Sequence, residues 1–176
     1  MSYWRNRGIV TSTDNTNDVL DRLLDKPHVI HGTWDEKDSM LHAAEPMIPS
    51  DTTHCFFVDS DEIWNGNDLE RIIGLLDDWD SVAFKPYSFY AGFTRYMSGY
   101  EEQSPPWGWQ RIQRWYPGAK FHTHRPPTVL AKDGKPFREH RHLSHEDTDK
   151  MGIRFRHYSY CLPRQTSDKI DYYHSR

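Results

Sequence analysis

The chain has 176 residues and a formal net charge of −4 at pH 7. This length suits one domain with a core of its own, and the acidic balance excludes a basic field that would attract nucleic acid as a general partner. No apolar run reaches the length of a membrane span, and the first residues, MSYWRNR, show no apolar signal region. We therefore predict a single cytoplasmic domain, 1–176, with no membrane span.

The first half of the chain alternates between helical and strand patterns. Apolar residues at helical spacing predict helices, and short apolar runs predict strands. The expected order is a helix at 16–25, a strand at 28–31, a helix at 36–45, a strand at 55–58, a helix capped by Asn67 and a strand at 81–90. This alternation predicts an α/β fold with a mostly parallel central sheet flanked by helices.

The second half has a different character. Residues 91–150 are rich in Gly, Pro, His, Arg and aromatic residues, and only two short strands are expected there, at 110–115 and 127–131. Loops of that length are usually functional or disordered, and the aromatic density argues against disorder. A last strand is predicted at 154–160, and Pro163 opens a terminal helix that runs to about 173.

Two acids, Asp59 and Asp61, follow the apolar run at 55–58, which has the pattern of a strand buried on both faces. Carboxylates at the carboxyl end of a parallel strand lie where α/β proteins bind ligands. Two such oxygen ligands suit Mg²⁺ or Mn²⁺ held jointly with substrate phosphates. A strand-end turn that precedes a helix is the simpler explanation, but the strand aims both acids at the ligand edge. The pattern favours chemistry on a phosphorylated small molecule.

Three segments together resemble family-2 glycosyltransferases: STDNT at 12–16 before a Leu-rich helix, VDSDE at 58–62, and RHYSY at 156–160. The first is similar to the family's GSTD-x-T turn, the second to its metal-binding Asp-x-Asp, and the third to the closing HYSY of a bacterial and phage-like subgroup. The resemblance implies a GT-A-like fold, with a nucleotide-sugar-binding half at about 8–90 and an acceptor-binding half at about 91–176. Only about ten residues precede the turn, so we expect an N-terminally truncated domain without the family's first βα unit.

The resemblance also implies an activity: metal-dependent transfer of a sugar from a nucleotide-diphosphate donor to a hydroxyl of a glycan or lipid-linked acceptor, with inversion. The cation would be Mn²⁺ or Mg²⁺. The metal ligands implied are Asp59, Asp61 and His157, and the donor-binding residues are Ser12, Thr13, Asp14, Asp59, Arg111 and Arg114. Inversion needs a carboxylate base, for which Asp147 is expected and Glu146 is the next candidate.

Each of these assignments has a simpler competitor. Residues 12–14 can cap the following helix without a ligand, and the acids at 146–147 can form a solvated loop. Trp107 and Trp109 suit an acceptor site, because Trp rings stack on sugars, and Arg111 and Arg114 suit pyrophosphate. Core packing explains the two Trp residues equally well.

Two other functions stay open at this point. Without its first unit, the chain could be an inactive remnant that binds a glycan or a partner. Alternatively, His140 and His142 would lie on one face of a strand and could hold Zn²⁺ or Fe²⁺ in an oxygenase or hydrolase. The histidines of that second hypothesis are His122, His124, His140, His142 and His145.

Overall fold

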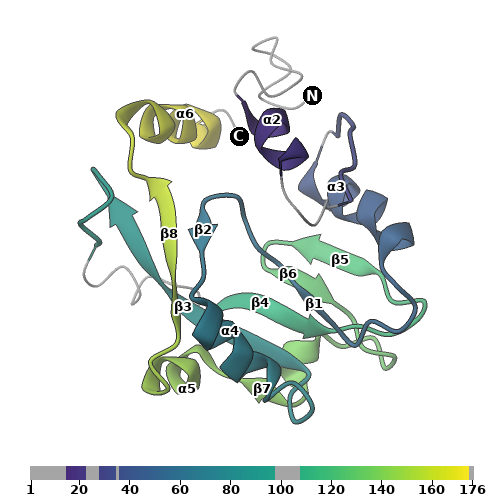
Figure 1. Cartoon of the computed structure of the whole chain (residues 1–176). Coiled ribbons are helices and arrows are strands. Elements are labelled where there is room, and N and C mark those ends of the chain that lie inside the picture. Colours follow the sequence, from purple (N-terminus) through teal and green to yellow (C-terminus); the bar gives the residue numbers. More distant parts are fainter. Residues whose placement is uncertain (1–14, 23–27, 35, 98–107, 175–176) are drawn as a thin grey trace.

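The computed structural model describes residues 15–22, 28–34, 36–97 and 108–174 (Figure 1). In these residues the helices are α2 (Thr16–Asp21), α3 (Lys37–Ala44), α4 (Gly66–Ile73), α5 (His145–Lys150) and α6 (Pro163–His174), with short 3-10 helices at Glu45–Met47 and Phe137–Glu139. The strands are β1 (His54–Phe56), β2 (Glu62–Ile63), β3 (Ser81–Tyr90), β4 (Trp109–Arg114), β5 (Phe121–His124), β6 (Pro127–Val129), β7 (His142–Leu143) and β8 (Arg154–Tyr160).

The main sheet of the described residues has the strand order β1-β4-β3-β8-β2, with β7 also paired to β3. Strands β7 and β8 run parallel to β3, whereas β4 runs antiparallel to both β1 and β3, and β2 runs antiparallel to β8. Strands β5 and β6 form a separate antiparallel hairpin beside α3 (Figure 1). The fold is therefore α/β with a mixed sheet.

The prediction of a mostly parallel sheet was wrong. The helix-strand alternation of the first half suggested parallel pairing of its strands. In the structure β4, which comes from the second half, lies between them and is antiparallel to each. Local periodicity identifies strands but carries no information on a strand that inserts from a distant part of the chain.

Two further expectations about the first half were wrong. Residues 28–31 form no strand, and the side chains of Val29 and Ile30 are 44% and 38% exposed. The apolar run at 55–58 is not buried on both faces, because Phe56 and Val58 are 39% and 51% exposed. In the described residues β1 is an edge strand, and its apolar run borders the cleft described below.

The main core lies between α4 and the sheet. Ile72 of α4 packs against Val82, Phe84 and Phe155, each at most 2% exposed. Asn65 caps α4, because its side chain accepts a hydrogen bond from the backbone N of Asn67 at 2.9 Å. The cap is therefore Asn65 and not the predicted Asn67. A second cluster, built from Trp115, Ala119, Phe121, Val129 and Phe137, packs beneath the β5–β6 hairpin.

None of the helices in the described residues combines the length and apolar character needed to cross a bilayer.

Candidate functional site

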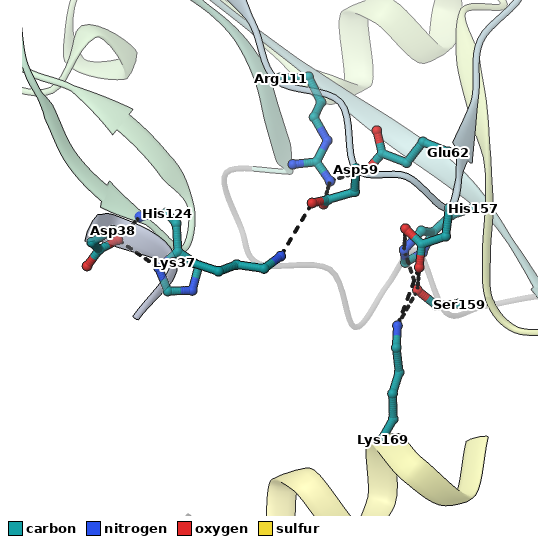
Figure 2. Close-up of polar contacts among 10 residues, drawn as sticks. Lys37, Asp38, Asp59, Glu62, Arg111, His124, His157, Ser159 and Lys169 are labelled. Carbon is teal, nitrogen blue, oxygen red and sulfur yellow. Dashed lines mark hydrogen bonds and ion pairs between the residues drawn. The ribbon is translucent and has the colours of Figure 1, made fainter. Parts of the chain in front are cut away.

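A cleft of about 940 Å³ lies between the end of β1 and α6. Its walls come from α3, the residues after β1, the start of β4, the β5–β6 turn, the end of β8 and α6. Ionisable side chains from several elements line it, among them Lys37, Asp59, Asp61, Arg111, His157 and Lys169. Figure 2 shows that Lys37 and Lys169 reach the site from different sides, from α3 and α6. The cleft thus collects carboxylates and cations from segments far apart in sequence.

Asp61 lies at the centre of one polar cluster. Its backbone carbonyl accepts a hydrogen bond from the Tyr158 N of β8 at 2.8 Å, which holds its carboxylate near His157 and Ser159. These two side chains lie on one face of β8, because they are two residues apart in a strand. The Ser159 Oγ lies 2.6 Å from Asp61 Oδ2 and 2.6 Å from His157 Nε2. Lys169 Nζ donates to Ser159 Oγ at 2.6 Å and lies 3.4 Å from Asp61 Oδ2.

The hydrogen bonds of Ser159 assign the protons in this cluster. A hydroxyl has one proton to donate, and that of Ser159 goes to the Asp61 carboxylate. Its oxygen then accepts from the ammonium of Lys169, which can only donate, and from His157 Nε2. Nε2 therefore carries the ring proton. The other ring nitrogen, Nδ1, is buried and has no hydrogen-bond partner among the described residues.

The cluster keeps Asp61 ionised and His157 neutral. Burial alone would raise the pKa of Asp61, but the hydrogen bond from Ser159 and the proximity of His157 and Lys169 lower this pKa below its ordinary value. Burial, opposed by the charge of Asp61 and reinforced by Lys169, lowers the pKa of His157 from 6.5 to about 4. A neutral imidazole can supply a lone pair to a metal ion.

Asp59 belongs to a second polar cluster. Arg111 of β4 donates to Asp59 Oδ2 at 3.0 Å and to the carboxylate of Glu62. Lys37 Nζ lies 3.4 Å from Asp59 Oδ1. The Glu62 side chain is 0% exposed and that of Arg111 is 4% exposed, and Trp64 Nε1 donates to Glu62 Oε2 at 3.3 Å. The two acids of the Asp-x-Asp pattern therefore point to different partners.

Burial raises the pKa of Glu62 above its ordinary value, and the charge and hydrogen bond of Arg111 only partly offset that rise. The guanidinium also lies 5.0 Å from the ring centre of Trp109 and 5.7 Å from that of Phe155. Such cation–π contacts favour a desolvated cation. Arg111 is thus a structural cation in the wall of the cleft as well as one of its lining residues.

The stability of the fold should depend on the protonation state of His157. The pKa of His157 falls from 6.5 to about 4 on folding. The neutral ring therefore contributes fully to the free energy of unfolding above pH 6.5, and this contribution is lost as the pH falls towards 4. Between pH 7 and pH 5 the loss is about 2 kcal/mol. In EDTA-containing buffer, urea unfolding of the wild type should lose about that much more stability over this range than unfolding of His157→Gln. Equal pH slopes would contradict this burial argument.

A divalent cation fits part of the site. Asp61 Oδ1 and His157 Nε2 are 3.7 Å apart. The carboxylate suits Mn²⁺ or Mg²⁺ when phosphate oxygens complete the shell, and the imidazole can act as a further ligand once its proton shifts from Nε2 to Nδ1. Among the described residues, no three His, Cys, Asp or Glu side chains converge as a preformed metal centre. The protein itself therefore offers two ligands, Asp61 and His157. Asp59, the third ligand that the sequence suggested, binds Arg111 and Lys37 instead.

The structure does not bring Arg114, Asp147 and Glu146 into the lining of the cleft. Arg114 pairs with Asp80 at the other end of β4. Asp147 accepts from the Ser144 hydroxyl at 2.7 Å in the first turn of α5, and Glu146 lies 3.0 Å from His145 Nε2.

Helix α5 does touch the wall of the cleft. His145 lies so close to Gly108 that a Cβ at residue 108 would come within 2.5 Å of it. The base role of Asp147 or Glu146 stays a prediction. Ser12, Thr13, Asp14 and Trp107 lie outside the described residues.

Trp109 does line the cleft. Its ring packs edge-on against His157 with centroids 4.9 Å apart, and its Nε1 is buried without a hydrogen-bond partner among the described residues. The alternative metal site is dispersed: His142 Nδ1 lies 3.2 Å from Ser81 Oγ, and His140 Nε2 lies 3.3 Å from Asp133. The His-based oxygenase or hydrolase therefore lacks a metal centre in the part of the chain that is described.

Sequence reasoning missed Lys37, Glu62, Ser159 and Lys169 as members of the site. Ser159 could have been found, since a side chain two residues from His157 on a strand shares its face. Lys169 stands in a segment, 169–173, that belongs to the family resemblance, but no site role was assigned to it. The places of Lys37 and Lys169 depend on how α3 and α6 pack.

Comparison with known proteins identifies the family. The family model described as Glycosyl transferase family 2 matches residues 11–156, a span that includes the Asp-x-Asp pattern. A search of curated proteins finds no match. Because the family model covers most of the chain, the family's α/β fold and its general activity, glycosyl transfer between a donor and an acceptor, apply to the domain as a class. The chain belongs to glycosyl transferase family 2.

Proposed function

We propose that the cleft binds a nucleotide-diphosphate sugar and that the chain transfers the sugar to a hydroxyl group of a glycan or lipid-linked acceptor. The observation that supports the proposal is that Asp61 contacts His157 and Ser159 in the lining of a cleft of about 940 Å³. This volume is of the size that small-molecule and cofactor sites use. Cationic side chains around the two acids suit a diphosphate.

The residues divide the work of binding a donor. Lys37 and Lys169 lie where an ammonium can attract phosphate oxygens, and Trp109 offers a ring to a flat ligand or a sugar. Asp61 and His157 would hold Mn²⁺ or Mg²⁺, which neutralises negative charge on the leaving diphosphate when it is bound. Arg111 fixes the direction of Asp59. Inversion at the sugar would require a base for the acceptor hydroxyl, with Asp147 or Glu146 as the candidates that the sequence predicts.

The second candidate is a domain without transferase activity that binds a glycan or a protein partner. Donor binding separates the two, because such a binding domain has no need of a nucleotide diphosphate. We expect calorimetric titration with uridine and guanosine diphosphates to show binding of at least one of them, strengthened by Mn²⁺. Asp61→Asn should remove the effect of Mn²⁺, because a neutral amide is a much weaker ligand for a hard cation.

Asp133→Asn is the matched control, since it removes a carboxylate that lies outside the cleft lining and is 48% exposed. This variant should bind like the wild type. Failure of every diphosphate to bind, with and without Mn²⁺, would reject the transferase proposal and favour the inactive binding domain. Equal loss in both variants would point to a general effect of charge and not to a site at Asp61.

A further inference from the structure

We infer that Lys169 is a cation built into the cleft, whose ammonium holds the place beside Asp61 that a divalent cation takes when the donor binds. The inference rests on the cation site of the proposed function. Lys169 is then a positioning residue from α6, and its ammonium and the metal ion exclude each other at Asp61. Figure 2 shows Lys169 extending from α6 to Ser159 and the neighbouring polar cluster.

The ammonium and the Ser159 hydroxyl use the same oxygen of Asp61. Ser159 Oγ donates to Oδ2 at 2.6 Å, and Lys169 Nζ lies 3.4 Å from that oxygen while it donates to Ser159 at 2.6 Å. The proton assigned to His157 Nε2 points at Ser159. In this arrangement Asp61 Oδ2 and His157 Nε2 already take part in hydrogen bonds, whereas Asp61 Oδ1 lies 3.7 Å from Nε2. A divalent ion that used both Asp61 oxygens and His157 Nε2 would require Lys169 to move away from Oδ2 and the ring proton to shift from Nε2 to Nδ1.

Charge repulsion makes the exclusion strong. A divalent ion on Asp61 would lie within a few ångströms of the ammonium, in a site where the side chains of Asp61 and Lys169 are only 23% and 33% exposed. Water screens such a pair poorly compared with an exposed one. The two cations therefore compete for one carboxylate.

The position of Lys169 follows from the way α6 begins. Strand β8 ends at Tyr160, and Pro163 opens α6. The Gln165 side chain accepts from the backbone N atoms of Cys161 and Leu162, at 3.2 and 3.4 Å. This turn brings the helix back over the cleft. The ammonium also lies 5.1 Å from the ring centre of Tyr160.

A surface ion pair without function is the simpler explanation. Such pairs contribute little and are made by exposed groups. Here the ammonium reaches a Ser159 hydroxyl that belongs to a residue only 2% exposed, and a His157 side chain only 8% exposed shares that hydroxyl. A buried hydroxyl that joins three ionisable groups at the cleft is better explained as a binding site than as surface decoration.

The test is titration of the full chain with Mn²⁺ alone, followed by the electron paramagnetic resonance signal of the free ion. Lys169→Met should bind Mn²⁺ at least about 10-fold tighter than the wild type, within the roughly 5- to 150-fold range of couplings between sites. Lys169→Arg keeps the charge and should stay close to the wild type. Circular dichroism checks that each variant is folded.

Lys132→Met is the matched control. Lys132 Nζ lies 5.4 Å from the ring centre of Tyr116, as Lys169 lies over Tyr160, and it lies outside the cleft lining. The substitution makes the same change in net charge and should leave Mn²⁺ affinity unchanged. An equal gain in Mn²⁺ affinity in Lys132→Met would overturn the inference, because the gain would then reflect the overall charge of the protein.

Two other results would overturn the inference: unchanged or weaker Mn²⁺ binding by Lys169→Met, or no Mn²⁺ binding by either protein. Uridine and guanosine diphosphates titrated without metal keep these failures distinct from failure of the proposed function. If the protein binds a diphosphate but Lys169→Met does not change Mn²⁺ affinity, the donor site stands and only the competition between Lys169 and the metal ion is rejected. Binding of Mn²⁺ by Lys169→Met alone would support the inference most strongly.

Discussion

Arg111→Met is expected to lower the free energy of unfolding by about 3–5 kcal/mol, the cost of removing one partner from a buried ion pair. The reason is the environment of Glu62, whose side chain is 0% exposed and is paired with Arg111. Methionine leaves that carboxylate buried without its cation. Asp59 contributes less to the loss, because its side chain is 44% exposed and can turn to water. Urea unfolding at pH 7.5 measures the effect.

The double variant Arg111→Met with Glu62→Gln provides the control. A neutral amide can still accept from Trp64 Nε1, as Glu62 does at 3.3 Å, and carries no charge to bury. We expect the double variant to recover at least half of the lost stability, through the coupling between neighbouring sites. A double variant as unstable as Arg111→Met would show that lost packing against Trp109 and Phe155, and not the buried charge, sets the cost.

The deficit of Arg111→Met should also depend on pH in a defined direction. Burial already raises the pKa of Glu62 in the wild type, and loss of the neighbouring cation raises it further. A carboxyl group whose pKa is raised on folding destabilises the folded state little below its unfolded pKa and most at high pH, where it must be ionised. The deficit should therefore shrink as the pH falls from 7.5 towards 5. A deficit that is constant with pH would argue against a buried carboxylate as its cause.

The elements with the strongest local pattern could be predicted from the sequence. The strands Ser81–Tyr90 and Arg154–Tyr160 have the predicted bounds, because long runs rich in aromatic residues carry their own signal. The helix that opens at Pro163 also begins where expected. The direction of the strands could not be predicted, since the place of β4 between β1 and β3 depends on long-range pairing.

The site was predictable where two residues share a strand face or a family motif. Asp61 Oδ1 and His157 Nε2 lie 3.7 Å apart, and their role as metal ligands, which the family resemblance implied, stays a prediction. The grouping of Arg111 with Arg114 was avoidable: both lie on β4, and an odd spacing of three places their side chains on opposite faces. Arg111 accordingly lines the cleft, while Arg114 pairs with Asp80. Lys169 and Lys37 depend on the packing of helices, for which a single sequence carries no signal.

The two acids of the Asp-x-Asp pattern should differ in their effect on sugar transfer. Release of nucleotide diphosphate from a panel of nucleotide sugars measures the turnover. For the best donor, we expect Asp61→Asn to reduce turnover by about 100-fold or more, which is a loss of about 2.7 kcal/mol of transition-state stabilisation. The reason is that Asp61 is the carboxylate that lies beside His157 and Ser159, where charge on the leaving diphosphate would be neutralised.

Asp59→Asn should cost about 10-fold or less, because the carboxylate of Asp59 is engaged by Arg111 and Lys37 and is not among the groups that face His157. Asparagine keeps an oxygen that can accept from Arg111. Both variants should remain folded, which separates them from Arg111→Met. Equal losses at the two positions would mean that Asp59 turns to the same ion or phosphate as Asp61 when the donor binds. In that case the orientation of the Asp59 carboxylate in this structure would describe the state before donor binding, and its contacts with Arg111 and Lys37 would break when the donor binds.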